Sequence, residues 1–536
     1  MIKIEALTFY YSDAAQPALK DISLEVRDGE FVLLTGPSGG GKSSLCRCLN
    51  GLIPHFYGGK ISGRVMVGGL DTLKSSTREL AAKVGFVFQD PENQLVSMDV
   101  EREIAFGLEN LAFSRDLIAK RIEESLDTIG IAGLRYRSLS ELSGGEKQKV
   151  AIASVLALHP DILILDEPTS ELDPKGAEEV LSVITRLNDE LGLTVILVEH
   201  RLDRVLQYAD RLIILDGGKA IIDGGIRDVM AGRYRELAAS GIGIPPLIRL
   251  FQELKSRDPS LSQIPLTVKE GRAMLRQTVK DNASSENIRP YNKEMRRRKP
   301  VINVKRLWHA YPNGLTALKN VSLKIGEGEF VAIMGRNASG KTTLAKHFNR
   351  LLTPTKGAVE IDGVDTGKAT VAELARKVGF VFQNPDHQLF ADSVWEEASF
   401  AARNFGALDG ATEARTGELL ARCGLGDRLD DHPYRLSYGQ KRRLNLVSVL
   451  SYQPKLVLLD EVLIGQDPEN AAFLLDLLWE HVAGGGAVIM VSHAPEITNR
   501  YASRLLFFED GGVLIDAPVG QAVSQLAALG KVAYVA

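Results

Sequence analysis

The segment GPSGGGKS at residues 36–43 follows the apolar run FVLLT and opens the helix-like stretch KSSLCRCLNGL. The chain repeats this arrangement at residues 335–342, where GRNASGKT follows FVAIM and opens KTTLAKHFNRL. A glycine-rich loop between a strand and a helix lets backbone N–H groups crowd around phosphate oxygens, and the helix N-terminus adds its positive dipole end. Each segment therefore predicts a phosphate-binding loop in an α/β domain.

The repeat extends well beyond the two loops. Their lysines lie 299 positions apart (341 − 42), and FVFQDPENQL, LILDE and LVEH are echoed in the same order by FVFQNPDHQL, LLLDE and MVSH. The length of 536 residues also exceeds the roughly 250–300 residues at which a single core stops growing. We expect two tandem nucleotide-binding domains at residues 1–225 and 300–536, with an extension of the first at 226–280 and a polar linker at 281–299.

Composition is that of an ordinary globular protein, with 45% hydrophobic residues, 25% charged residues and a net charge of −4. This balance gives no global attraction to nucleic acid or anionic lipid. No apolar run has the length of a membrane-spanning helix, so any membrane role is predicted to be peripheral. The three cysteines offer no disulfide framework and are interpreted as reduced thiols. The basic run at residues 296–299 fits a solvated tether better than a contact with lipid or RNA.

The phosphate loops carry the first set of candidate site residues. Lys42 and Lys341 can reach the β- and γ-phosphates of a nucleotide, and Ser43 and Thr342 can place a hydroxyl on Mg²⁺. The predicted nucleotide-binding residues of the two loops are Gly36, Pro37, Ser38, Gly39, Gly40, Gly41, Lys42, Ser43, Ser44, Gly335, Arg336, Asn337, Ala338, Ser339, Gly340, Lys341, Thr342 and Thr343.

An Asp-Glu pair ends an unbroken apolar run in each half, as expected of a buried parallel strand. Ligands of such sheets gather at the carboxyl ends of the strands. Asp166 and Asp460 are therefore predicted to hold Mg²⁺ through its waters, and Glu167 and Glu461 to orient or deprotonate the attacking water. An acidic pair at a strand end is by itself usually a solvated cap. Here each pair follows a phosphate loop in the same half, by 124 residues in the first (166 − 42) and 119 in the second (460 − 341). This association favours a catalytic role over a solvated cap.

Further polar residues end apolar strands at matching places in the two halves. These candidates for contact with the γ-phosphate or its water are Gln89, Gln383, His200 and His493, and both glutamines are also candidate Mg²⁺ ligands. Tyr11 and Tyr311 align with each other near the start of each repeat. They could stack on adenine, or they could pack in the core.

The order of these motifs, together with LSGGE at residues 142–146, resembles that of the ABC ATPases over nearly the whole chain. The resemblance implies two P-loop ATPase domains, each with a RecA-like α/β core, an antiparallel β subdomain and a helical signature subdomain. It implies ATP and Mg²⁺ as cofactors. It also implies that the signature segment of one domain closes on the nucleotide held by the other, which adds the candidates Ser143, Gly144, Gly145, Ser437, Tyr438 and Gly439.

The two halves differ at their signature segments. The second reads LSYGQ, with Tyr438 where the first has Gly144, and the second Asp-Glu pair continues VLIGQD where the first continues PTSELD. In the family's arrangement the site of Lys341 and Glu461 would face the intact first signature. A bulky ring beside phosphate could slow closure at the other site, so we expect the Lys341 site to hydrolyse ATP faster.

The segments QDPENQLV and QNPDHQLF, with the extension that contains IPPLIRLFQEL and PLTVKEGRAML, resemble the ATPases of energy-coupling-factor (ECF) importers. The resemblance implies a motor at the cytoplasmic face of the membrane. Its partners would be a membrane T component and an S component that binds a vitamin or a transition-metal ion. Asp90, Glu92 and Asp386 could meet arginines of the T component, or could form only a solvated acidic turn. The alternatives are a tandem ABC translation factor on ribosomes and a fused sugar-importer ATPase.

Overall fold

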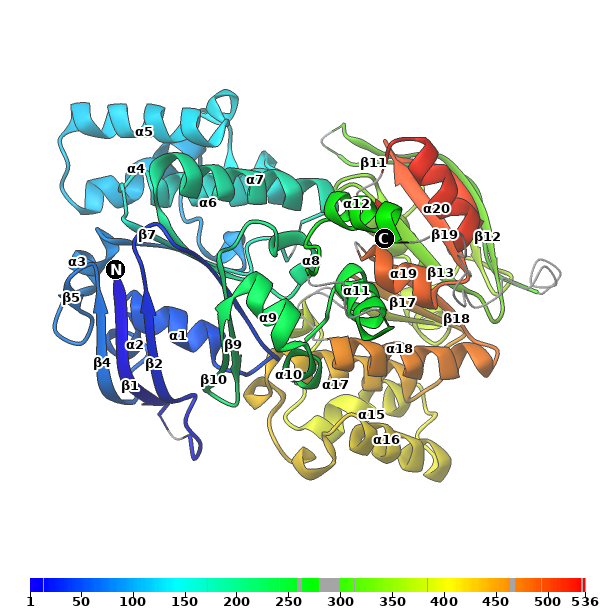
Figure 1. Ribbon diagram of the computed structural model, residues 1–536. Helices are drawn as coiled ribbons and strands as arrows, with labels where there is room; N and C mark the ends of the chain where they lie inside the picture. Colours follow the sequence, from blue (N-terminus) through cyan, green and yellow to red (C-terminus); the bar gives the residue numbers. More distant parts are fainter. Residues whose placement is uncertain are drawn as a thin grey trace. The chain divides into compact units, whose positions relative to one another are not determined.

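The computed structural model describes residues 1–12, 14–170, 172–240, 242–257, 263–278, 299–312, 314–382, 384–462, 468–492, 494–531 and 534–535. The chain divides into two compact units, unit 1 at residues 1–283 and unit 2 at residues 284–536 (Figure 1). The expected linker at 281–299 falls, apart from its last residue, outside the described residues, so its boundaries stay a prediction.

Unit 1 contains two sheets within its described residues. One has the strand order β2-β1-β4-β5 and is antiparallel, and the other has the order β10-β9-β3-β8-β7-β6. Strands β9, β3, β8, β7 and β6 run parallel, while β10 is antiparallel to β9. The strands are β1 (Ile2–Tyr10), β2 (Leu19–Val26), β3 (Phe31–Thr35), β4 (Lys60–Val67), β5 (Leu70–Asp71), β6 (Val84–Val87), β7 (Ile162–Asp166), β8 (Thr194–Val198), β9 (Arg211–Asp216) and β10 (Lys219–Gly225).

Figure 1 labels the α-helices of unit 1. With the short η helices included, the helices are α1 (Lys42–Leu49), α2 (Leu52–His55), α3 (Thr77–Ala81), η1 (Pro91–Asn93), α4 (Val100–Asn110), α5 (Arg115–Ile129), η2 (Ala132–Leu134), η3 (Leu139–Glu141), α6 (Gly144–Leu156), α7 (Pro174–Leu191), α8 (Leu202–Val205), α9 (Ile226–Gly232), α10 (Tyr234–Ala239), α11 (Pro246–Arg257) and α12 (Val268–Thr278). Helices α4, α5 and α6 come between β6 and β7 in the sequence. They pack on one another and form the helical subdomain.

Unit 2 repeats this plan, with sheets of order β12-β11-β14-β15 and β16-β17-β18-β13-β19-β20. Its strands are β11 (Pro300–Ala310), β12 (Thr316–Gly326), β13 (Phe330–Gly335), β14 (Lys356–Ile361), β15 (Val364–Asp365), β16 (Val378–Val381), β17 (Leu456–Asp460), β18 (Ala487–Val491), β19 (Arg504–Glu509) and β20 (Gly512–Pro518). Its helices are α13 (Lys341–Phe348), α14 (Val371–Ala375), η5 (Pro385–His387), α15 (Val394–Asn404), α16 (Gly410–Arg422), η6 (Gly426–Arg428), η7 (Pro433–Arg435), α17 (Tyr438–Leu450), α18 (Pro468–Ala483), α19 (Pro495–Tyr501) and α20 (Val519–Ala528).

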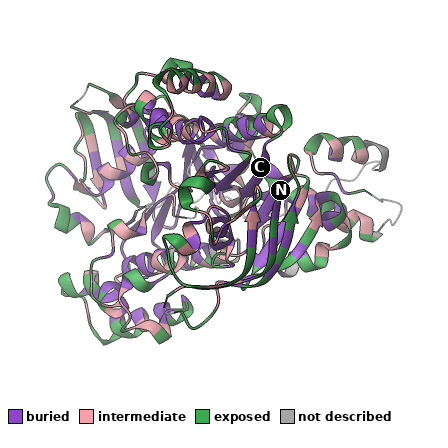
Figure 2. Ribbon diagram, turned by 90° about the vertical axis from the view of Figure 1, so that its left-hand side faces the viewer, coloured by how far each residue is buried: buried purple, intermediate pink, exposed green. Residues whose placement is uncertain are grey.

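The predicted fold class, two α/β domains with added antiparallel and helical parts, is confirmed. Strands β3, β7 and β8 are buried at every position, which is the pattern of parallel strands covered on both faces. Figure 2 shows such strands as purple ribbons between greener helices. In each unit one apolar cluster joins the parallel sheet to the antiparallel sheet. A second cluster joins the parallel sheet to the helices. The strand ends are therefore fixed by packing on both faces.

The proline-broken extension folds onto the core of unit 1. Ile248 and Phe251 of α11 are buried in the same cluster as the parallel sheet. Helices α11 and α12 meet at Gly271, where an added Cβ would lie 2.6 Å from Cδ1 of Leu247. A side chain at that position would require the Leu247 side chain to move, so the glycine allows the two helices to pack closely.

Cys46, Cys48 and Cys423 are free and buried, as expected of packed thiols. Across the part of the chain that the structure describes, no helix has both the length and the apolar character needed to cross a lipid bilayer.

One half-buried imidazole predicts a pH dependence of unit 2 stability. His481 lies near the C-terminus of α18, where the helix dipole favours the charged form by only about 0.3–1 kcal/mol. Removal from water outweighs the helix dipole and lowers the pKa of His481 to about 4. Because the unfolded side chain has a pKa of about 6.5, the unfolded chain binds a proton between pH 6.5 and 4 that the folded unit does not. Stability from neutral His481 is therefore lost as pH falls through this window.

We expect the His481→Leu variant to lose about 2 kcal/mol less unfolding free energy than the wild type between pH 7 and pH 4.5. All three tryptophans, Trp308, Trp395 and Trp479, lie in unit 2, so urea unfolding followed by tryptophan fluorescence reports this unit alone. Equal losses in the two proteins would contradict the assignment.

Candidate functional site

The phosphate-loop lysines lie inside their own loops. Lys42 Nζ donates hydrogen bonds to the carbonyls of Gly36 at 2.9 Å and Pro37 at 3.0 Å. Lys341 Nζ donates in the same way to Gly335 at 2.9 Å and Arg336 at 2.7 Å. Both lysines begin their helices, α1 and α13, and are buried. The two ammonium groups are thus positioned where a phosphate held by the loop would meet them.

The loop glycines are required by close packing as well as by conformation. Gly36 and Gly335 both have φ of 145°, and an added Cβ would lie 1.9 Å from the Leu215 carbonyl oxygen in unit 1 and 2.2 Å from that of Phe508 in unit 2. No side chain can occupy these positions without moving β9 or β19. The sequence pattern therefore reflects a loop pressed against the neighbouring strand.

The acidic strand ends fit a divalent cation. Asp460 ends β17, and its Oδ1 accepts a hydrogen bond from Thr342 Oγ1 at 3.3 Å. Burial, and then the charge of Glu461, raise the pKa of Asp460 to about 6. Burial likewise raises the pKa of Asp166, whose Oδ1 is buried without a hydrogen-bond partner among the described residues. A desolvated carboxylate beside a hydroxyl gains most from a cation that offsets its charge, so these residues fit Mg²⁺.

The catalytic candidates Glu167 and Glu461, which come directly after the two aspartates in the sequence, share an uncommon backbone conformation. Glu167 has φ of 52° and Glu461 has φ of 54°, both in the left-handed region that side chains other than glycine seldom adopt. Each amide is fixed to the next parallel strand, with Glu167 N donating to the Val198 carbonyl at 3.0 Å and Glu461 N to that of Val491 at 3.1 Å. Strain that the surrounding sheet holds in place, twice in the same position, is typical of a functional turn.

In unit 1 the structure brings three predicted residues together. Glu167 Oε1 lies 2.9 Å from His200 Nε2, and Glu167 Oε2 accepts from Gln89 Nε2 at 2.9 Å. The three side chains follow β7, β8 and β6, which are neighbours in the sheet. The matching residues of unit 2, Gln383 and His493, lie outside the described residues, so their positions stay predictions.

Tyr11 and Tyr311 are half-buried and tied to the helices that follow the phosphate loops. The Tyr11 hydroxyl lies 2.9 Å from Ser44 Oγ, and the Tyr311 hydroxyl lies 3.1 Å from Thr343 Oγ1. These bonds place a ring edge beside each loop, which is compatible with both interpretations of the tyrosines.

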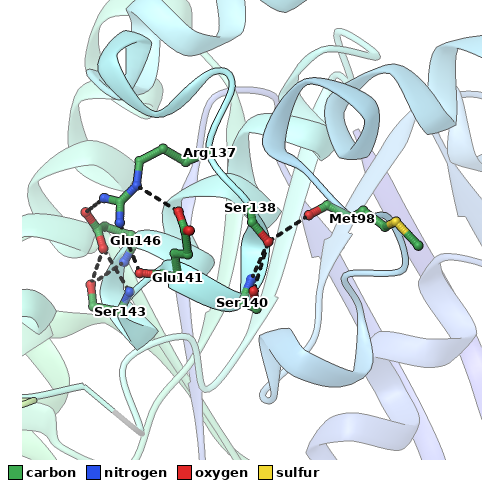
Figure 3. Close-up of polar contacts among 7 residues, drawn as sticks. All are labelled: Met98, Arg137, Ser138, Ser140, Glu141, Ser143 and Glu146. Atoms are coloured by element: carbon green, nitrogen blue, oxygen red, sulfur yellow. Dashed lines mark hydrogen bonds and ion pairs between the residues drawn. The ribbon is translucent and has the colours of Figure 1, made fainter. Parts of the chain in front are cut away.

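The signature segments begin helices through capping boxes. Ser143 is the N-cap of α6, and Glu146 Oε2 accepts from Ser143 N at 2.8 Å and from Ser143 Oγ at 2.7 Å. Figure 3 shows this pair beside Arg137, which lies 3.8 Å from Glu146 and also contacts Glu141. Among the described residues, the Ser143 side chain therefore bonds within its own helix and not to the phosphate loop of its own unit.

Ser437 caps α17 in the same way, but its partner is the neutral Gln440, whose Oε1 accepts from Ser437 N at 2.9 Å. The capping role of Glu146 and Gln440 was missed by the sequence prediction. The spacing of serine and Glu or Gln three residues later was the signal available for it. The first signature thus carries a carboxylate, with an arginine to offset it, where the second carries an amide.

Comparison with known proteins identifies the family of both halves. A family model described as ABC transporter matches residues 19–170 and 318–463. A Methanosarcina mazei protein whose name describes an ABC transporter ATP-binding protein is 38% identical, over 97% of this chain and 89% of that protein. Bacillus subtilis YkoD, whose name describes an HMP/thiamine import ATP-binding protein, is 36% identical over 98% and 93% of the two chains.

Among solved structures, cbiO1 from Clostridium perfringens, described as part of the ABC transporter complex cbiONQ, aligns with a TM-score of 0.41 and 32% identity. The alignment covers 51% of this chain and 98% of the cbiO1 chain.

Proposed function

Because this chain belongs to the ABC transporter family of ATP-binding proteins, with one such domain in each half, we propose that it is the ATP-hydrolysing motor of an ECF-type importer. The observation that carries the catalytic part is Glu167 in a left-handed turn, held between His200 and Gln89 beside the buried Asp166. ATP binding is a property of the family. The ECF type, the T and S components and the cargo are the proposal.

In the proposed mechanism Lys42 and Lys341 bind the β- and γ-phosphates from within their loops. Mg²⁺, when bound, would offset phosphate charge, and the residues that would hold it are Ser43, Gln89 and Asp166 in unit 1 and Thr342, Gln383 and Asp460 in unit 2. Glu167 and Glu461 orient and deprotonate the attacking water, and His200 keeps the Glu167 carboxylate in place through its 2.9 Å contact.

We further propose that the two domains pair head to tail, so that the Ser143 signature completes the Lys341 site and the Ser437 signature completes the Lys42 site. The capped N-terminus of each signature helix presents backbone N–H groups that favour an anion. ATP would hold the domains together, and hydrolysis with phosphate loss would let them separate.

The surface that would receive the membrane partner lies around the turn after each glutamine. In unit 1 the exposed side chains Val96, Met98 and Phe106 follow the η1 turn, and in unit 2 Phe390 and Phe400 follow the η5 turn. Exposed apolar side chains beside acidic ones suit a basic amphipathic helix of a T component. We propose that the chain binds peripherally to the cytoplasmic face of the membrane through these two surfaces.

The cargo proposed for the first test is a thiamine precursor or thiamine, because the relative YkoD is named for HMP/thiamine import and matches over nearly the full length of both chains. Other vitamins, cobalt and nickel are the remaining members of the proposed cargo class.

The test is co-expression of the chain with candidate T and S membrane proteins from the same genome, followed by affinity purification and reconstitution in liposomes. We expect a membrane complex that takes up the S-component ligand only with ATP. The double variant Lys42→Ala and Lys341→Ala should keep the complex but lose uptake. Sedimentation of the chain with ribosomes, without membrane proteins in the preparation, would instead support the translation-factor alternative.

A further inference from the structure

A buried carboxylate in unit 1 has no part in the mechanism above. Glu199 follows β8 directly, precedes His200, and is 4% exposed. Burial raises the pKa of Glu199, and the charge of Glu167 raises it further, while Thr169, Arg204 and His200 act in the opposite direction. A carboxylate in such a place costs several kcal/mol unless its hydrogen bonds are made. Its retention beside the catalytic candidates therefore needs an explanation.

One hydrogen bond of the Glu199 carboxylate joins two loops of the site, and the other lies within its own segment. Oε1 accepts a short hydrogen bond from Thr169 Oγ1, and Oε2 accepts from His200 N at 3.2 Å. The Glu199 amide is itself anchored to the Leu34 carbonyl on β3 at 3.2 Å. Thr169 is buried and lies two residues after Glu167, in a turn closed by the bond from Ser170 N to the Glu167 carbonyl at 3.2 Å.

These contacts complete a ring. It runs from Glu167 along the chain to Thr169, across to Glu199, along the chain to His200, and back to Glu167 through the 2.9 Å contact of the imidazole. The ring links the segment after β7 to the segment after β8 by side chains, in addition to the backbone bonds of the sheet. Movement of either segment would break a bond to a buried carboxylate, which is costly.

Unit 2 lacks both partners of this link. By alignment of LVEH with MVSH and of LDEPTS with LDEVLI, the sequence has Ser492 in place of Glu199 and Leu463 in place of Thr169. Ser492 Oγ accepts from Ala494 N at 3.1 Å, which is a local turn bond that reaches no other segment. Leu463 carries no hydroxyl. The link is thus a property of the first site.

We propose that Glu199 is a positioning residue of the first ATPase site, where its hydrogen bonds to the Thr169 hydroxyl and to the His200 backbone amide fix the segment whose His200 ring contacts Glu167. The inference rests on the proposed ATPase function of that site. Glu199 touches neither nucleotide nor water in this role. It fixes the angle at which the base and its histidine meet, a contact for which small misplacements are expensive in rate.

The test uses the assembled transporter in a Glu461→Gln background, so that turnover reports the first site. We expect Glu199→Ala to lower kcat about tenfold with KM for ATP within about twofold, because the lost contact orients the base and does not bind phosphate. Thr169→Val, which keeps the shape and removes the hydroxyl, should lower kcat to a similar extent. The double variant should lose little more than either single variant, because both changes open the same ring.

Glu199→Gln is the conservative rescue, since an amide can accept from His200 N and donate to Thr169. We expect it to keep kcat within about threefold of the background. Ser492→Ala, measured with Glu167→Gln, is the matched control in unit 2 and should change kcat less than twofold. Nucleotide-binding stoichiometry, measured for every variant, separates lost turnover from lost folded protein.

A normal kcat for Thr169→Val, or a Glu199→Gln variant as slow as Glu199→Ala, would overturn the proposal. A background enzyme whose turnover does not depend on Glu167 would instead refute the ATPase role proposed for the first site. The two failures are therefore distinguishable.

Discussion

Replacing Glu461 with Gln should lower the ATPase turnover of the assembled transporter about tenfold or more, and the same change at Glu167 should lower it far less. Loss of a general base costs on the order of 10²–10⁴ in rate at the site that carries the flux. Both glutamates have the same left-handed backbone and the same anchoring to the neighbouring strand, so the backbone at the two bases does not distinguish the sites.

The expected difference comes from the signature segments. In the proposed head-to-tail pairing, the Glu461 site receives Ser143 and two glycines, whereas the Glu167 site receives Ser437 followed by Tyr438. A tyrosine at the first turn of the helix adds bulk where a phosphate must approach backbone N–H groups. Steady-state ATPase rates of the two single variants, with the double variant as the zero reference, measure the asymmetry. Equal losses would count against it.

The repeated motifs predicted the fold because each one marks a place where the chain has few choices. Gly36 and Gly335 lie where any side chain would collide with the next strand, and the apolar runs before Asp166 and Asp460 are strands covered on both faces. Such residues specify local geometry almost by themselves, and the tandem repeat supplied an independent copy of each. The pairing of Glu167 with His200 and Gln89 then follows because β7 lies between β8 and β6 in the sheet.

Other parts of the site depend on contacts that no local pattern encodes. The left-handed turn at Glu167 is imposed by the sheet and not by the residue, since glutamate has no preference for that conformation. The sequence around Glu199 predicts only a polar residue at the end of a strand. The fold shows that its carboxylate is buried and bonded to Thr169, 30 residues away. The capping role of Glu146 was readable from its spacing, but its proximity to Arg137 was not.

The acidic turns that follow Gln89 and Gln383 in the sequence are the basis of the second prediction with a large expected effect. Glu92 is paired with Lys147 and Asp386 with Lys441, each across 55 residues, with N to O distances of 2.5 Å and 2.6 Å. Lys147 and Lys441 belong to the signature helices α6 and α17. Asp90 caps η1 by accepting from Glu92 N at 2.8 Å. The side chains of Glu92 and Asp386 remain 69% and 41% exposed, so each could still meet an arginine of a membrane partner.

We expect the double charge reversal Glu92→Lys and Asp386→Lys to reduce co-purification with the T component to about a tenth or less. Charge-assisted hydrogen bonds are worth about 1.5–3 kcal/mol each, and reversal adds repulsion to their loss. Glu25→Lys with Glu413→Lys makes the same change in net charge at exposed positions outside the acidic turns, and should leave co-purification unchanged. Full recovery of the T component with the first pair of substitutions would refute a role for these carboxylates in recruitment.

Charge reversal also breaks the internal ion pairs, so a loss of recruitment could arise from a disturbed turn. Lys147→Met with Lys441→Met breaks the same two pairs and leaves both carboxylates in place. If the carboxylates face the partner, this variant should bind the T component at least as well as the wild type, because a competing cation has been removed from each. If the turns only need internal support, it should fail as badly as the charge reversal. Comparison of the two double variants therefore assigns the acidic groups either to the membrane contact or to the packing of the turn on the signature helix.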